Sequence, residues 1–161
     1  MTYAGSAEEN TAAVAARMGL WSDFDDLRRD HVGYVGSRMT FTTLLASGRR
    51  AFTEGRTADA VDYFNAAREM RGDHYEAWFF MGMISHNARN FAEADRYFAL
   101  AIDLGADAPL VLFSRAVNAA MDGRTADAIL MLRLAADADP ARFGESARAM
   151  IAQLETAGVA R

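Results

Sequence analysis

The chain has 161 residues, of which 52 % are apolar and 24 % are charged, and its formal net charge is -5. This composition excludes an unfolded chain, and because no apolar run approaches about 18 residues it also argues against a membrane-spanning helix. The N-terminus carries acidic residues where a signal peptide would carry basic ones. We therefore expect a globular protein of one domain in the cytoplasm, without membrane insertion.

Several classes of function are disfavoured by residue types that the chain lacks. It has no cysteine, which removes disulfides, thiolate metal sites and cysteine nucleophiles. All 17 basic residues are arginine, so no lysine can form a Schiff base or complete a phosphate-binding loop. The negative net charge opposes a phosphate backbone, and nucleic acid is not expected as a partner.

Residues 1–40 contain two signals for short helices. Ser6 with Glu9, and Ser22 with Asp25, have the spacing of a capping box at the start of a helix. We expect an N-terminal helical extension, which Thr40 follows as the cap of the next helix. Three roles stay open for the extension: it docks on the rest of the chain, it pairs with a second copy in a homodimer, or it binds a partner.

A unit of 34 residues follows three times. The hexapeptide GRTADA begins at Gly55 and again at Gly123, and a degenerate copy, RNFAEA, begins halfway between them at Arg89. The units defined by this spacing are 41–74, 75–108 and 109–142.

Small residues recur at the same three positions of each unit, whereas the twenty-fourth position is always large, as Phe64, Phe98 or Leu132. Small residues let two helices approach closely, and a large residue fills the remaining space. Each unit is therefore predicted to be a packed pair of antiparallel helices. The small residues are Gly48, Gly82 and Ala116, then Ala60, Ala94 and Ala128, then Ala67, Ala101 and Ala135.

The repeated hexapeptide is predicted to be the turn between the two helices. Gly55 and Gly123 fit the left-handed residue that ends a first helix. The threonine two residues after each glycine is expected to cap the second helix. In the middle unit we expect Asn90 and Glu93 to form a capping box instead.

A last helix is predicted from Phe143 to Ala157, with Gly158 ending it. One face is apolar and the other polar, which is what the end of a stack of repeats requires. We expect 143–161 to be a capping helix and a tail. The apolar residues at helical spacing are Ala147, Met150, Ile151 and Leu154, and the polar ones between them are Glu145, Arg148 and Gln153.

This pattern resembles the tetratricopeptide repeat, because Trp78, Gly82, Ala94 and Phe98 stand at the spacing of that family's signature. Pro140 matches the final proline of the signature in the third unit. The resemblance implies an all-α fold: an α-solenoid of three helical hairpins with the N-terminal helical extension and the C-terminal capping helix.

Catalytic arrangements are poor in this sequence. His31, His74 and His86 lie in different segments without metal-ligand spacing, and we interpret them as structural or surface residues. Arg115 occupies a position that is normally apolar, and we expect its charge to lie at the edge of the hairpin or to pair with an aspartate. We expect no enzyme activity, no cofactor and no metal.

A binding groove is the function that the resemblance implies. In such repeats the first helix of each unit lines a concave side with its second, fifth, ninth, twelfth and thirteenth residues. The groove would be mostly apolar, and either the N-terminal helices cover part of it or it is open to a partner. The predicted partner-binding residues are Leu45, Arg49, Phe52, Phe79, Met83, His86, Asn87, Leu110, Phe113, Val117 and Met121.

Two branches of the family help to interpret this groove. Members that clamp the acidic C-termini of heat-shock chaperones use lysine, asparagine and arginine, whereas Leu45 and Phe79 occupy such positions here and only Arg49 could meet a carboxylate. In size, repeat count and the pair Phe79-Phe80 the chain is similar to translocator-class type III secretion chaperones. Those chaperones hold an extended stretch of their client in an apolar groove.

We therefore expect a non-enzymatic protein–protein interaction module. It would bind an apolar or amphipathic segment of a partner protein in the concave groove, as a dedicated chaperone or an adaptor. Two alternatives remain, a self-associating assembly scaffold and a translocator-class type III secretion chaperone.

Overall fold

The computed structural model describes the backbone of residues 39–159 and the side chains of residues 39–157. The two short helices predicted near the N-terminus lie outside these residues. The described part is all α-helical, without a strand. Its helices are α3 (Phe41–Thr53), α4 (Thr57–Met70), α5 (Tyr75–Asn87), α6 (Phe91–Asp103), α7 (Ala108–Met121), α8 (Thr125–Ala138) and α9 (Pro140–Val159).

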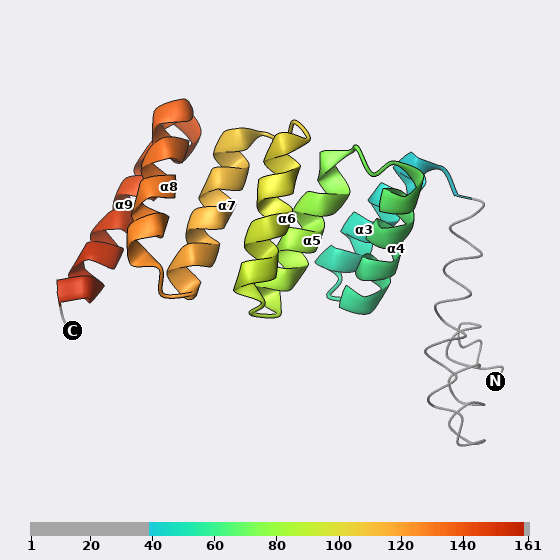
Figure 1. Ribbon diagram of the computed structural model, residues 1–161, viewed down its shortest axis with the longest axis horizontal. Coiled ribbons are helices and arrows are strands. Elements are labelled where there is room, and N and C mark those ends of the chain that lie inside the picture. Colours follow the sequence, from blue (N-terminus) through green and yellow to red (C-terminus); the bar gives the residue numbers. More distant parts are fainter. Residues whose placement is uncertain (1–38, 160–161) are drawn as a thin grey trace, which may run out of the picture.

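The three hairpins follow one another in chain order along the long axis of the molecule, and α9 lies at the end of the stack (Figure 1). Each helix packs against the next, and the three hairpins are α3 with α4, α5 with α6, and α7 with α8. Helix α3 also contacts α5, α7 contacts α9, and His86 of α5 meets Asn118 of α7. Each first helix therefore meets the next first helix or, at the end of the stack, α9. The architecture is the predicted stack of three helical hairpins with a final helix.

The predicted contact between small and large residues is confirmed in every hairpin. A Cβ atom added to Gly48 would lie 2.7 Å from the ring of Phe64, and one added to Gly82 would lie 2.6 Å from the ring of Phe98. The third hairpin has Ala116 at this position and the smaller Leu132 opposite it, in one buried cluster. Leucine is smaller than phenylalanine, and this difference makes room for the extra methyl group of alanine.

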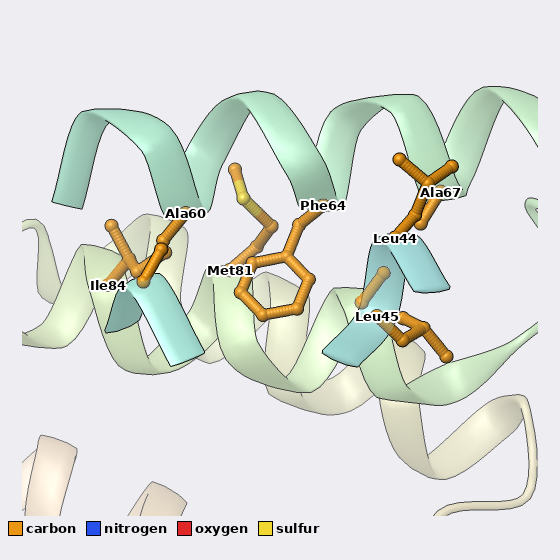
Figure 2. Close-up of a cluster of buried hydrophobic side chains, with 9 residues drawn as sticks. Leu44, Leu45, Ala60, Phe64, Ala67, Met81 and Ile84 are labelled. Atoms are coloured by element: carbon orange, nitrogen blue, oxygen red, sulfur yellow. The ribbon is translucent and has the colours of Figure 1, made fainter. Parts of the chain in front are cut away.

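The first hairpin shows how such a contact builds the core. The ring of Phe64 extends from α4 among side chains of α3 and α5 (Figure 2), and it is fully buried. Its ring also stacks on Phe80 of α5, with centroids 5.0 Å apart. A single aromatic residue therefore joins its own hairpin to the next one.

The glycines of the repeated hexapeptide adopt the predicted left-handed conformation, with φ of 74° at Gly55 and 79° at Gly123. At each, the glycine N–H donates to a carbonyl three residues earlier, and the following N–H donates to one five residues earlier. Gly105 ends α6 in the same way, with φ of 88°. Arg89 ends α5 with φ of 62°, although it carries a side chain.

The predicted caps of the second helices are wrong. Helices α4 and α8 begin at Thr57 and Thr125 themselves, and the preceding arginines are the N-cap residues without a side-chain cap. Asn90 is the N-cap of α6 but makes no capping bond either. The left-handed turn that precedes each of these helices fixes the backbone of its N-cap residue. The N-cap residue is therefore not in the extended conformation from which a capping side chain reaches the first N–H groups of the helix.

Glu93 is used by tertiary contacts instead of a capping box. Its carboxylate accepts from the hydroxyl of Ser85 on α5 at 3.1 Å and from that of Tyr97 at 3.4 Å. Thr40, in contrast, caps α3 as predicted, since its Oγ1 accepts from the N–H of Thr43 at 3.2 Å.

The capping helix is longer than predicted, because α9 begins at Pro140 and continues through Gly158 to Val159. Proline fits the first turn of a helix, where its missing N–H costs nothing. Arg142 donates to Asp107 Oδ2 at 2.6 Å, and this hydrogen bond is the main cause that lowers the pKa of Asp107 below its ordinary value. The contact ties the start of α9 to the start of α7. The four predicted apolar residues of α9 pack as expected against α7 and α8.

Gly82→Ala should destabilise the protein, because its new methyl group overlaps the ring of Phe98. We expect a net loss of about 1 kcal/mol in the free energy of unfolding, since overpacking costs about 1–3 kcal/mol and the higher helix propensity of alanine returns up to about 1. Urea denaturation measures the loss. The double variant Gly82→Ala/Phe98→Leu copies the third hairpin and should recover most of it.

Gly144→Ala is the matched control, because an added Cβ there meets nothing closer than 3.9 Å. It should raise the free energy of unfolding by about 0.5–1 kcal/mol. If Gly82→Ala raises the free energy of unfolding as much as Gly144→Ala does, the Gly82–Phe98 contact does not limit the approach of the helices.

Arg89→Gly should stabilise the protein by about 0.5–1 kcal/mol. The left-handed conformation costs a residue with a side chain about 1–2 kcal/mol, and part of that gain is offset by the greater entropy of glycine in the unfolded chain. Thermal denaturation followed by circular dichroism measures the change. Gly123→Arg is the reciprocal control and should lower stability; an unchanged or lower melting temperature for Arg89→Gly would contradict the argument.

Candidate peptide-binding face

The predicted partner-binding residues lie on α3, α5 and α7, the first helices of the three hairpins. We call their shared surface the first-helix face and define it by the second, fifth, ninth, twelfth and thirteenth residue of each unit. These are Thr42, Leu45, Arg49, Phe52 and Thr53, then Glu76, Phe79, Met83, His86 and Asn87, then Leu110, Phe113, Val117, Ala120 and Met121.

Much of the apolar stripe on this face stabilises the stack itself. Leu45 is only 5 % exposed and belongs to the core, so it offers a partner almost no surface. Phe52 packs edge-on against Phe80 of the next hairpin, with ring centroids 5.5 Å apart. Phe79 and Met83 pack against the buried cluster that contains Phe98. The repeat signature does not require these large residues, but the contacts between neighbouring hairpins use them.

The third hairpin repeats this arrangement with the capping helix in place of a fourth hairpin. Phe113 of α7 stacks on Phe143 of α9, with ring centroids 5.4 Å apart. Phe113 and Val117 both remain partly exposed. Helix α9 therefore packs beside α7 as the first helix of a further unit would.

Helix α7 carries the most exposed apolar residues of the face. Leu110 is 37 % exposed and Met121 is 52 % exposed. They are eleven residues apart, which is about three helical turns and about 16 Å, so they lie on one side of the helix. With the partly exposed Phe113 and Val117 between them, they form an apolar stripe along α7.

The charged residues of the face neutralise one another. Arg49 of α3 donates from Nη1 to Oε1 of Glu76 on α5 at 2.7 Å. The arginine side chain is 49 % exposed and that of the glutamate is 18 % exposed. Arg49, which the sequence analysis considered as a partner for the carboxylate of a bound segment, is therefore already paired with Glu76 of the same chain.

A polar cluster links α5, α6 and α7 beside the face. The buried Asn118 donates from Nδ2 to the carbonyl of Phe91 at 2.8 Å, so its Oδ1 faces Nδ1 of His86 at 3.0 Å. Since an amide oxygen can only accept, His86 Nδ1 carries the proton and Nε2 is left as the acceptor of the neutral ring. Asn118 was not predicted as a site residue; a lone amide in the apolar run of α7 is its only signal in the sequence.

The expectation that Arg115 pairs with an aspartate is confirmed, and the partner is Asp95. The Nε and Nη2 of Arg115 donate to the two carboxylate oxygens of Asp95 at 2.8 and 3.1 Å. Both side chains are about three-quarters buried. This bidentate pair joins α7 to α6, and it holds the third hairpin on the second.

A separate cavity of about 240 Å³ is lined by Asn65, Arg68, Glu69 and Trp78 of α4 and α5. The guanidinium of Arg68 lies 3.8 Å above the centre of the Trp78 ring. Its Nη1 donates to the side chain of Asn65 at 3.0 Å. The cavity contains no residue of the first-helix face.

Residues 39–157 contain no group of three or more potential metal-ligating side chains. In the same part of the chain no helix is long and apolar enough to cross a membrane.

The sequence matches no protein-family model, and no curated protein matches it either. Solved structures match its fold. The tetratricopeptide domain of Arabidopsis OM64 aligns with a TM-score of 0.64 and 15 % identity over 72 % of this chain and 94 % of that one. The first such domain of Spaghetti (RPAP3), bound to the HSP90 peptide SRMEEVD, aligns with a TM-score of 0.66 and 15 % identity over 74 % and 93 %.

The type III secretion translocator chaperone SycD of Yersinia enterocolitica is equally similar. Its alternative dimer aligns with a TM-score of 0.67 and 18 % identity, covering 74 % of this chain and 94 % of that one. Its complex with a peptide of the translocator YopD aligns with a TM-score of 0.65 and 17 % identity over 73 % and 93 %. These similarities confirm the fold that the sequence predicted, a helical stack of the tetratricopeptide type.

Asn118→Ala should lower the free energy of unfolding by about 1–3 kcal/mol, because it removes two buried hydrogen bonds and leaves a small cavity. The loss can be measured by urea denaturation. A second measurement reports on His86: its ¹⁵N chemical shifts should indicate a protonated Nδ1 in the wild type and a mixture of tautomers in the variant. Unchanged shifts would mean that Asn118 does not orient the ring.

Proposed function

We propose that the protein is a non-enzymatic interaction module that binds an apolar or amphipathic segment of a partner protein on the first-helix face. The observation that carries this proposal is the stripe along α7, where Leu110 and Met121 are exposed three turns apart on one side of the helix. A stripe of about 16 Å matches about five residues of an extended chain. An extended segment could therefore place two or three alternate side chains on it.

The solved structures of similar fold support a peptide-binding function. One holds a peptide of HSP90 and another a peptide of the translocator YopD. As part of the proposal, we extend the ability to hold a peptide to this chain. The protein would then act as a cytoplasmic chaperone or adaptor. A translocator-class secretion chaperone is the narrower version.

Self-association is a second candidate function, and exposed residues of α8 favour it. Leu130 and Leu134 are 58 % and 47 % exposed and stand one turn apart. Large exposed apolar residues on one side of a helix are suited to contact a second copy. Sedimentation velocity over a range of concentrations tests it: growth beyond a dimer, abolished by Leu134→Glu, would favour a scaffold.

The face can be tested with matched pairs of substitutions. The probe is a fluorescein-labelled peptide of 15 residues without charges, with leucine or valine at every second position and serine, threonine or glutamine between them. Leu110→Glu/Met121→Glu should weaken its binding at least tenfold, since even partial burial of two large side chains contributes more than about 1.4 kcal/mol. Fluorescence anisotropy measures the affinity.

Leu130→Glu/Leu134→Glu is the control, because it removes two exposed apolar residues and adds the same charge on α8. It should bind the probe as the wild type does, and circular dichroism should show both double variants folded. The proposal is contradicted if the wild type does not bind the probe, or if only the α8 pair weakens binding.

A further inference from the structure

The two junctions between first helices differ in chemistry at equivalent positions. Where α3 meets α5, the ninth residue of one unit and the second of the next are Arg49 and Glu76, and they form an ion pair of 2.7 Å. At the junction of α5 with α7 the same two positions hold Met83 and Leu110. The first-helix face is thus charged but neutralised at one end and apolar at the other.

The ion pair accounts for the formal charge of this face in the part of the chain that the structure describes. Arg49 is its one arginine, and Glu76 is its one acidic residue. The glutamate is the more buried partner, at 18 % exposure against 49 % for the arginine. An approaching segment would therefore meet the arginine first, with the carboxylate held behind it.

We infer that Glu76 is a specificity-determining residue that keeps acidic segments off the first-helix face. The inference rests on the proposed function of that face and adds the class of segment that it rejects. A carboxylate arriving at Arg49 meets a guanidinium whose charge Glu76 already balances. It would lose its own hydration for a weaker attraction than a free arginine offers, and the Glu76 carboxylate would repel it. An uncharged segment meets no such penalty and lies over a neutral pair.

Glu76 also lies in the first turn of α5, where an acidic residue stabilises the helix. A purely structural role would make a substitution lower the melting temperature without changing the choice of peptide. The two roles therefore separate when stability and peptide preference are measured on the same variant.

Two labelled probes test the inference: the acidic peptide SRMEEVD with a free carboxyl terminus, and SRMQQVN with an amidated terminus, which keeps the arginine but has no carboxylate. The wild type should not prefer the acidic peptide. Glu76→Gln leaves Arg49 without its carboxylate partner and should bind SRMEEVD about three- to tenfold more tightly than SRMQQVN at low salt. Because the gain is electrostatic, it should disappear at about 0.5 M salt.

Two variants serve as controls. Glu155→Gln makes the same change of net charge at an ion pair between α8 and α9, where Glu155 lies 4.0 Å from Arg133, and it should leave the preference unchanged. Arg49→Glu/Glu76→Arg restores an ion pair with the charges exchanged and should behave as the wild type does.

The inference is overturned if folded Glu76→Gln shows no preference for the acidic peptide, or if the wild type already prefers it. Failure of the proposed function gives a different result. In that case the uncharged alternating peptide fails to bind the wild type, while Glu76→Gln still gains the acidic one.

Discussion

The close contact between a small residue and a large one is the constraint on which the rest of this structure depends. Gly48 and Gly82 lack the Cβ that would collide with Phe64 and Phe98, so each pair of helices can approach until the ring lies against the backbone. The third hairpin reaches the same packing with alanine and leucine. Since the contact recurs once in every unit, all three hairpins close in the same way.

Equal hairpins place their first helices next to one another, and this arrangement produces the chemistry of the candidate face. Arg49 meets Glu76, and His86 meets Asn118, only because each residue faces the next unit across a junction. The same junctions are held by apolar contacts such as Phe52 on Phe80. One row of side chains therefore both stabilises the stack and forms the surface offered to a partner.

This double use limits which residues can be specific to binding. A phenylalanine that packs between hairpins stabilises the fold even when part of its ring is exposed, so its removal affects stability and binding together. Leu110 and Met121 keep more exposed surface, and Glu76 acts through its charge. The specificity proposed for this protein accordingly rests on residues at the margins of the packed stripe.

The sequence by itself determined the repeating unit, the small and large residues of each hairpin, the left-handed glycines and the apolar side of the capping helix. These features are encoded within one unit, where helix periodicity and the needs of a tight turn act over a few residues. Only the tertiary structure decided that Leu45 is buried, that Glu93 accepts a hydrogen bond from Ser85 instead of capping its helix, and that Glu76 forms an ion pair with Arg49. Each of those outcomes depends on the distance between residues of different helices, which the packing of the helices sets and local sequence patterns do not contain.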